Sequence, residues 1–256
     1  MQLDLFERYK HNHFLVPISV NTLKKIGEHI GVSTDFLVFD ASCGKGGSVI
    51  SLAKMFGCSA IGLDDRPEFV EDGRRRTLFE DLSHLIDLLV HTNDDFPFDD
   101  DYFDLVLLCE PAYPSSTASK LNRLTRIVKP GGWIAYSGLV WKSDDENIAS
   151  ERLMKWLDSY LPCEPIDVEE LWAHLIEQGY EVEFVEHETD HTWENFLAPQ
   201  ARSIIENRLE YAESLEAQDM LDRWQLDLEI YHKCGGKQLL GYATFLLRCP
   251  WGKNKH

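Results

Sequence analysis

The sequence predicts an α/β fold in which helices cover both faces of a mostly parallel sheet. Two short apolar runs, residues 36–40 and 60–64, each end in an aspartate. A glycine-rich turn and a helical stretch follow the first run, and a second helical stretch begins near Pro67. Strands that alternate with helices at this spacing form parallel sheets, and ligands bind at the carboxyl ends of such strands.

The same alternation continues toward the C-terminus. A helix at 119–128 leads through Lys129-Pro-Gly-Gly132 into another strand, and a helix at 168–178 stops at Gly179. Apolar or alternating patterns predict the remaining strands at residues 84–91, 103–109, 133–137, 180–187 and 241–248.

Two further segments read as helical additions to this core. The stretch of about 141–165 is rich in tryptophan and charge, and residues 192–234 have helical periodicity. In the second stretch we expect a buried stripe of Trp193, Phe196, Ile204, Ile205, Leu209 and Tyr211. We therefore expect one domain over 1–256, with an N-terminal arm at 1–30, a core at about 30–140, 166–190 and 238–250, and helical cap insertions at about 141–165 and 191–237.

Charge and hydropathy exclude several classes of partner. The chain has 44 Asp and Glu against 25 Lys and Arg, for a formal charge of −19. Such a surface repels phosphate backbones, so nucleic acid is disfavoured as a substrate. No apolar run approaches the ~20 residues of a membrane span, and the start of the chain resembles no secretory signal. These features predict a cytoplasmic protein without a membrane partner.

The cysteines and histidines do not predict a metal site. None of the six cysteines forms a C-x-x-C pair. His11 and His13 form an H-x-H pair without a third ligand nearby, so we expect no metal.

The segment from Asp40 to Gly46 contains a glycine-rich turn directly after a strand. Glycine lets a ligand approach the backbone closely. A dinucleotide site would require a third glycine where Val49 stands, so nicotinamide cofactors are disfavoured. At the end of the next strand, Asp64 is placed to accept hydrogen bonds from a ribose diol, while Asp65 is suited to cap the following helix.

Two more blocks, Phe96-Pro-Phe98 through Phe103-Asp104 and Leu124 through Lys129-Pro-Gly-Gly132, complete a series of four. In this order and spacing the chain resembles the class I S-adenosylmethionine-dependent methyltransferases, especially the group similar to the ubiquinone/menaquinone C-methyltransferases. The resemblance covers about residues 36–137. It implies a Rossmann-like sheet with an antiparallel last strand, S-adenosyl-L-methionine as cofactor and S-adenosyl-L-homocysteine as product.

The resemblance also implies site residues. It places the cofactor against the turn, with Asp64 on the ribose, the adenine beside Asn93 and Asp94, and Glu110 facing the methyl group or substrate. Ser42 stands where the family has its first glycine, and Thr92 or Asn93 where it has an acid. The implied cofactor-binding residues are Asp40, Ser42, Gly44, Gly46, Asp64, Asp65, Asn93, Asp94 and Glu110.

The candidates for catalysis lie near the expected pocket mouth. Glu110, Tyr113 and His191 are candidate catalytic groups, and Tyr9, His11 and His13 lie on an arm placed to fold over the site. Each has an ordinary structural interpretation too: Glu110-Pro111 is typical of a turn, and His191 of a surface loop. The tryptophans, including Trp193, are typical of core packing.

A softer resemblance to bacterial methyltransferases of unassigned substrate involves Trp193 to Phe196, Glu229 to Lys233 and Gly241-Tyr242. Together these features predict methyl transfer to a small-molecule acceptor whose identity, like the oligomeric state, stays open. One alternative is a non-catalytic protein that binds S-adenosylmethionine on a methyltransferase scaffold. Another is an arsenite or thiol methyltransferase, which requires cysteines such as Cys43 and Cys109 to converge near the pocket.

Overall fold

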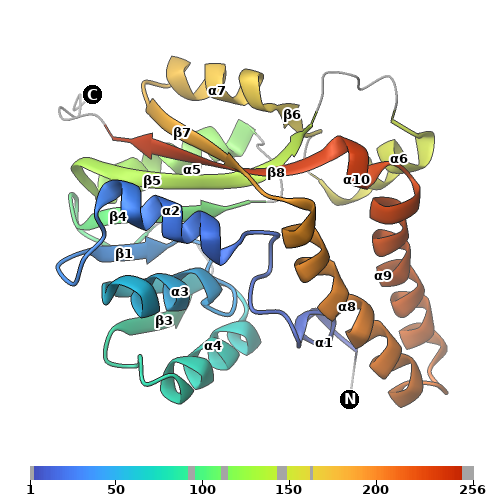
Figure 1. The fold of residues 1–256 in the computed structure, drawn as a ribbon. Coiled ribbons are helices and arrows are strands. Elements are labelled where there is room, and N and C mark those ends of the chain that lie inside the picture. Colours follow the sequence, from blue (N-terminus) through green and yellow to red (C-terminus); the bar gives the residue numbers. More distant parts are fainter. Residues whose placement is uncertain (1–2, 92–95, 111–114, 143–148, 162–163, 250–256) are drawn as a thin grey trace.

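The computed structural model describes residues 3–91, 96–110, 115–142, 149–161 and 164–249, and Figure 1 shows its fold. Within these ranges the strands form one sheet in the order β3-β2-β1-β4-β5-β8-β7, with β6 paired to β5. The strands are β1 (Leu37–Asp40), β2 (Ser59–Asp64), β3 (Ile86–Val90), β4 (Phe103–Cys109), β5 (Val128–Trp141), β6 (Ile166–Asp167), β7 (Glu181–His187) and β8 (Leu240–Arg248).

The direction of the strands confirms the predicted fold class. β1 pairs in parallel with β2 and β4, whereas β8 runs antiparallel between β5 and β7. β5 is longer than predicted at both ends, because it begins before the Lys-Pro-Gly-Gly turn and continues to Trp141. Phe103 pairs with Val128, but Leu105 already pairs with Trp133, so residues 129–132 form an irregularity within the strand.

Helices cover both faces of the sheet. α2 (Val20–Ile30), α3 (Gly47–Phe56) and α4 (Pro67–Phe79) lie on one face, and α5 (Ser115–Ile127) and α7 (Val168–Glu177) on the other (Figure 1). Side chains of a strand alternate between the faces, so Val38 joins the core under α2 and α3, while the adjacent Phe39 joins the core under α5 and α7. The sheet is therefore buried on both sides.

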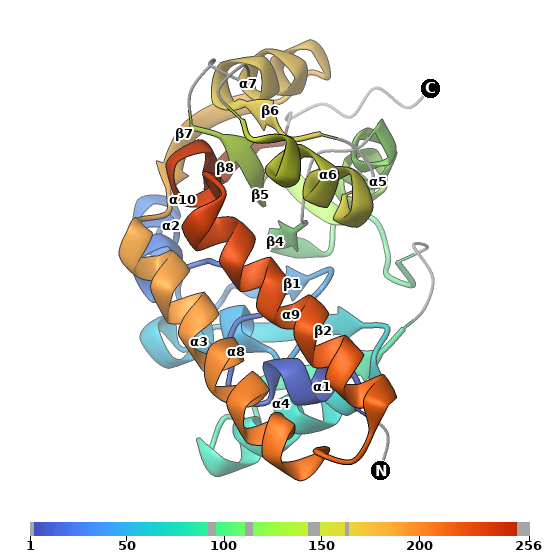
Figure 2. The ribbon, with the colours of Figure 1, turned by 90° about the vertical axis from the view of Figure 1, so that its right-hand side faces the viewer.

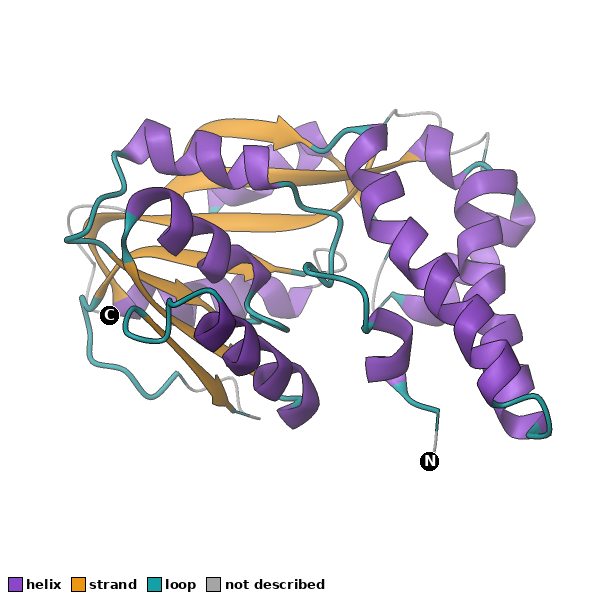
Figure 3. Cartoon of the chain, turned by 60° about the horizontal axis from the view of Figure 1, so that its bottom comes forward, coloured by secondary structure: helices purple, strands orange, loops and turns teal. Residues whose placement is uncertain are grey.

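A helical cap stands at one end of the sheet (Figures 2 and 3). It consists of α1 (Leu5–Tyr9), α6 (Glu151–Tyr160), α8 (Asp190–Glu210), α9 (Leu215–Lys233) and α10 (Gly236–Leu239). α8 and α9 lie side by side and enclose a small core of Leu3, Ile204, Ala217, Leu221 and Trp224. Three helices of the cap have polar N-caps. The side chains of Ser150, Thr189 and Ser214 accept hydrogen bonds from backbone amides in the first turns of α6, α8 and α9.

The structure corrects two details of the predicted cap. The helical stretch 192–234 is two helices, with a turn between Glu210 and Leu215. The expected buried stripe is also wrong in part: Ile205 and Leu209 are 65% and 81% exposed. The buried face of α8 instead follows Trp193, Leu197, Gln200, Ile204 and Asn207.

Among the described residues, no helix is both long enough and apolar enough to cross a membrane.

Candidate active site

The glycine-rich turn follows β1 at the carboxyl edge of the sheet. Asp40 accepts a hydrogen bond from the Ser42 amide at 3.1 Å, and the Ser42 hydroxyl donates to the carbonyl of Cys109 at 3.0 Å. Ser42 therefore ties the turn to the end of β4. A hydroxyl in place of the family's first glycine is accommodated here by a hydrogen bond.

Two glycines give the turn its shape. Gly44 and Gly46 have φ values of 53° and 74°, in the left-handed region that favours glycine. A side chain at Gly44 would also lie 2.5 Å from Leu15, and Gly46 forms the N-cap of α3. Leu15 fills the space beside Gly44, and Leu88 lies 2.9 Å from where a side chain at Gly46 would begin, so the turn packs closely and tolerates no side chain at either position.

Asp64 ends β2 and faces this turn. Its Oδ2 atom accepts a hydrogen bond from the Gly44 amide at 2.8 Å, and its Oδ1 atom accepts one from the Arg66 amide at 3.0 Å. Each carboxylate oxygen retains a further lone pair. Burial raises the pKa of Asp64, although the two backbone hydrogen bonds oppose the shift.

The predicted capping role of Asp65 is wrong. The N-cap of α4 is Arg66, and it makes no side-chain capping bond. Asp65 is exposed next to Asp64, whose carboxylate holds the Arg66 amide instead.

Asp40 is the most strongly shifted carboxyl at this edge. It is 2% exposed, and burial raises its pKa to about 7, with a smaller contribution from the charge of Asp64 and an opposing one from Lys120. The Ser42 amide also lowers the pKa. Asp40 therefore changes charge near neutral pH.

We expect Asp40→Asn to change how stability depends on pH. An unfolded aspartate titrates near pH 4, so between about pH 4 and 7 only the folded wild type keeps the Asp40 proton. By linkage this group's contribution to stability falls as pH rises through that window, by up to about 1.4 kcal/mol per unit. Urea unfolding should show the variant gaining stability relative to wild type from pH 4.5 to 7.5. Asp35→Asn, at an exposed position, is the control; a constant difference between Asp40→Asn and wild type across this range would contradict the shift.

Glu110 lies just beyond β4. Lys120 of α5 donates to its Oε1 atom at 2.7 Å, and the Tyr242 hydroxyl donates to its carbonyl at 3.2 Å. The side chain is thus engaged by a cation, while its backbone contacts β8. Asn93, Asp94 and Tyr113 lie outside the described residues.

His191 lies apart from the turn's hydrogen-bonded cluster. It is exposed in the first turn of α8 and contacts Asn195 at 3.2 Å. It lines a polar groove of about 580 Å³ that runs between α2, α3 and α8 and also includes His11, His13, Lys54 and Arg76. Within the described residues His11 pairs with Glu206 and His13 contacts Arg76.

Lys45, between the two glycines of the turn, is a residue whose role the sequence did not reveal. Its side chain has no exposed surface, and its Nζ atom donates to the carbonyls of Tyr9 and Lys10 at 2.8 and 3.3 Å. It also pairs with Asp72 of α4 at 3.4 Å. The turn therefore holds the C-terminal end of α1 directly.

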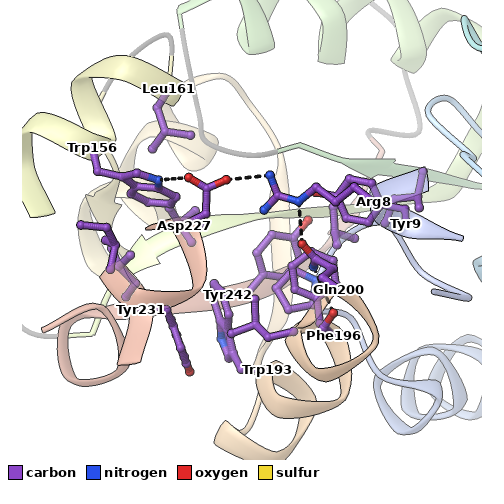
Figure 4. A pocket seen from close by; sticks show the side chains of 17 residues that line it. Arg8, Tyr9, Trp156, Leu161, Trp193, Phe196, Gln200, Asp227, Tyr231 and Tyr242 are labelled. Atoms are coloured by element: carbon purple, nitrogen blue, oxygen red, sulfur yellow. Dashed lines mark hydrogen bonds and ion pairs between the residues drawn. The ribbon is translucent and has the colours of Figure 1, made fainter. Parts of the chain in front are cut away.

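A cavity of about 240 Å³ lies on the cap side of the turn (Figure 4). Its walls come from distant parts of the chain and are mostly apolar and aromatic. They include Tyr9 of α1, Trp156 of α6, Trp193 and Phe196 of α8, Tyr231 of α9 and Tyr242 of β8. The softer C-terminal resemblance had drawn attention to four of these aromatic residues, and the structure brings them together around one space.

Cysteine does not contribute to this cavity within the described residues. Burial raises the pKa of the Cys43 and Cys109 thiols, which keeps both protonated at neutral pH. A thiolate pair acting on arsenite or a thiol is therefore disfavoured at this site.

Comparison with known proteins finds a family match for the central part of the chain. Residues 38–132 match the family model described as "Methyltransferase domain". A glycine/sarcosine/dimethylglycine N-methyltransferase of Actinopolyspora halophila is 27% identical over 46% of this chain, and the chloroplastic tocopherol O-methyltransferase of Arabidopsis thaliana is 30% identical over 48%. These matches cover 21% and 35% of the two relatives, so the chain spans well under half of their length.

A solved structure extends the likeness to nearly the whole fold. The SAM-dependent methyltransferase from Thiobacillus denitrificans, crystallised with S-adenosyl-L-homocysteine, superposes with a TM-score of 0.83 over 96% of this chain and 99% of its own. The sequence identity is 17%, so this match supports the fold. Residues 38–132 thus match a methyltransferase domain, and the whole described fold is that of the solved methyltransferase. The finer resemblance to the ubiquinone/menaquinone group stays a prediction.

Proposed function

We propose that this protein transfers a methyl group from S-adenosyl-L-methionine to a small-molecule acceptor. The observation that carries the proposal is the hydrogen-bonded cluster of Asp40, Ser42, Gly44 and Asp64 at the carboxyl edge of the matched domain. Relatives whose names describe methylation of small molecules support it. The formal charge of −19 further disfavours a nucleic-acid acceptor.

The residues at this edge fit an adenosyl cofactor. The free lone pairs of the Asp64 oxygens suit the two hydroxyls of a ribose. The left-handed backbone at Gly44 and Gly46 leads directly into the N-terminus of α3, whose amides suit the carboxylate of the methionine part. We propose that Asp40 to Gly46 contact the methionine part, that Asp64 and Asp65 lie by the ribose, and that Asn93 and Asp94 lie by the adenine.

When bound, the cofactor supplies an activated methyl group on a sulfonium carbon. The protein's task is to align the acceptor with that carbon and to exclude water. Tyr9, fastened to the turn by Lys45, closes one side of the space next to the site. Among the proposed catalytic groups Glu110, Tyr113 and His191, Glu110 has the strongest support, because its carbonyl is bonded to cavity-lining Tyr242.

Calorimetric titration of S-adenosylmethionine, S-adenosylhomocysteine and NAD⁺ into the purified protein tests the cofactor class. We expect micromolar affinity for the first two and none for NAD⁺. Absence of binding by either adenosyl compound would refute the proposal. Tight binding without turnover on a broad panel of alcohols, phenols and amines would instead favour the non-catalytic scaffold.

A further inference from the structure

We propose that the 240 Å³ cavity binds the methyl acceptor, and that this acceptor is an uncharged, largely apolar ring compound with an oxygen that accepts a hydrogen bond from Arg8. The inference rests on the proposed methyltransferase function and names its substrate class. It follows from the position of the cavity, the nature of its walls and the way its charges are paired.

The position of the cavity is set by contacts with the glycine-rich turn. Leu15 lines the cavity and packs directly on Gly44. Tyr242 lines it as well, and its hydroxyl donates to the Glu110 carbonyl at the end of β4. Lys45 of the turn holds the backbone of cavity-lining Tyr9. An occupant therefore lies next to the backbone that we assign to the cofactor.

Flat aromatic walls favour a ring-shaped occupant. Trp193 and Tyr231 are stacked, with ring centroids 4.7 Å apart and an interplanar angle of 15°, and both are more than nine-tenths buried. Tyr9 and Phe196 form a second stacked pair at 6.2 Å. A cavity of ~150 Å³ can hold benzene, so this space accommodates one or two rings.

The two charged side chains in the described cavity wall, Arg8 and Asp227, form an ion pair with each other. Arg8 donates to Asp227 Oδ2 at 2.6 Å, and Trp156 donates to Asp227 Oδ1 at 2.9 Å (Figure 4). Both carboxylate oxygens are thus engaged, and no free carboxylate in the described lining is available to neutralise an ammonium group. A cationic acceptor would also meet the Arg8 guanidinium, so we expect the cavity to reject it.

Several lining groups can bind a polar group of the ligand, since the buried Trp193 Nε1 atom and the Tyr231 hydroxyl also lack hydrogen-bond partners among the described residues. Arg8 uses Nη1 for Asp227 and Nε for Gln200 at 2.9 Å, while its Nη2 atom has no partner among the described residues. The Tyr9 hydroxyl likewise has none within the described ranges. A carboxylate on the ligand would compete with Asp227 for Arg8 and would repel it. A neutral oxygen on an apolar ring satisfies Nη2 without that cost.

Three probes of matched shape test this assignment: 2-naphthol, 2-naphthoate and protonated 2-naphthylmethylamine. Each is titrated into the full chain at neutral pH, with and without saturating S-adenosylhomocysteine, by calorimetry and tryptophan fluorescence. We expect 2-naphthol to bind and to change the fluorescence of Trp156 and Trp193. The anion and the cation should bind at least tenfold more weakly. Equal binding of all three probes, or a preference for the cation, would overturn the inference.

Two variants locate the binding site. Arg8→Lys keeps a positive charge beside Asp227 but removes the Nη2 atom that we assign to the ligand oxygen. We therefore expect 2-naphthol to bind about tenfold more weakly, while the affinity for naphthalene, which has no oxygen, stays the same. Leu161→Trp narrows the cavity and should abolish binding of both. Arg202→Lys, at an exposed position on α8, should change neither. Unchanged 2-naphthol affinity in Arg8→Lys and Leu161→Trp would refute the site.

The cofactor titration separates the two proposals. If S-adenosylhomocysteine binds but 2-naphthol does not, the cavity assignment fails and the methyltransferase proposal stands. If 2-naphthol binds in the cavity while neither adenosyl compound binds, the methyltransferase proposal fails, and with it the role of the cavity as an acceptor site.

Discussion

Asp64→Ala should weaken binding of S-adenosylhomocysteine by about 100-fold. We assign both carboxylate oxygens to the ribose hydroxyls, and hydrogen bonds to a charged group are among the stronger ones in proteins. The substitution also releases the Gly44 amide, which Asp64 holds at 2.8 Å, so the turn loses a support as well. Calorimetry on wild type and variant measures the change.

Two control variants separate the proposed contact of Asp64 with the ribose from the effects of neighbouring charge and of lost backbone support. Asp65→Ala removes an exposed neighbouring carboxylate and should alter affinity by less than about threefold. Asp64→Asn keeps one acceptor oxygen for the backbone and should fall between wild type and Asp64→Ala. Wild-type affinity in Asp64→Ala, with its fold verified by circular dichroism, would show that the nucleoside binds elsewhere.

Arg8→Ala should lower the free energy of unfolding by about 3 kcal/mol, because it leaves a buried carboxylate without its partner. The side chains of Arg8 and Asp227 are only 11% and 5% exposed, and their nearest charged atoms are 2.6 Å apart. This pair joins α1 to α9, so the loss should also loosen the arm over the cavity. Urea unfolding provides the measurement.

An exposed ion pair in the same cap serves as the comparison. Arg208 pairs with Asp222 at 2.6 Å, but Asp222 is 67% exposed, so Arg208→Ala should cost less than about 1 kcal/mol. Removing Arg8 and Asp227 together should cost less than the sum of the single changes, because no buried charge is left alone. If Arg8→Ala lowered the free energy of unfolding as little as Arg208→Ala does, the Arg8–Asp227 pair would not hold α1 in place.

The core of the fold could be predicted because its signals are local. Asp40 and Asp64 end short apolar runs, and glycines at 44 and 46 mark the turn that their positive φ values require. The alternation of strands and helices then predicts a parallel sheet covered on both faces. The glycine-rich turn and Asp64 could be singled out from their positions at the ends of predicted strands, whereas the other candidate cofactor residues were implied by the resemblance to the class I methyltransferases.

The cap could not be predicted in the same detail because its organisation depends on distant contacts. The turn between α8 and α9 contains neither glycine nor proline, so the helical periodicity predicted one continuous stretch where the structure has two helices. Lys45 reaches across 36 residues to Tyr9, and Arg8 reaches across 219 to Asp227. No local pattern in the sequence predicts these long-range contacts. Aromatic residues that line a cavity also have the same spacing as aromatic residues that fill a core, so the cavity could not be predicted.

A crystal structure of the protein with S-adenosyl-L-homocysteine tests the central claim most directly. We predict the ribose hydroxyls within hydrogen-bonding distance of the Asp64 carboxylate, the methionine part along Asp40 to Gly46, and the sulfur facing the cavity between Leu15 and Tyr242. A nucleoside bound in the polar groove beside His191, with Asp64 left on its backbone partners, would contradict both the cofactor site and the acceptor cavity proposed for this chain.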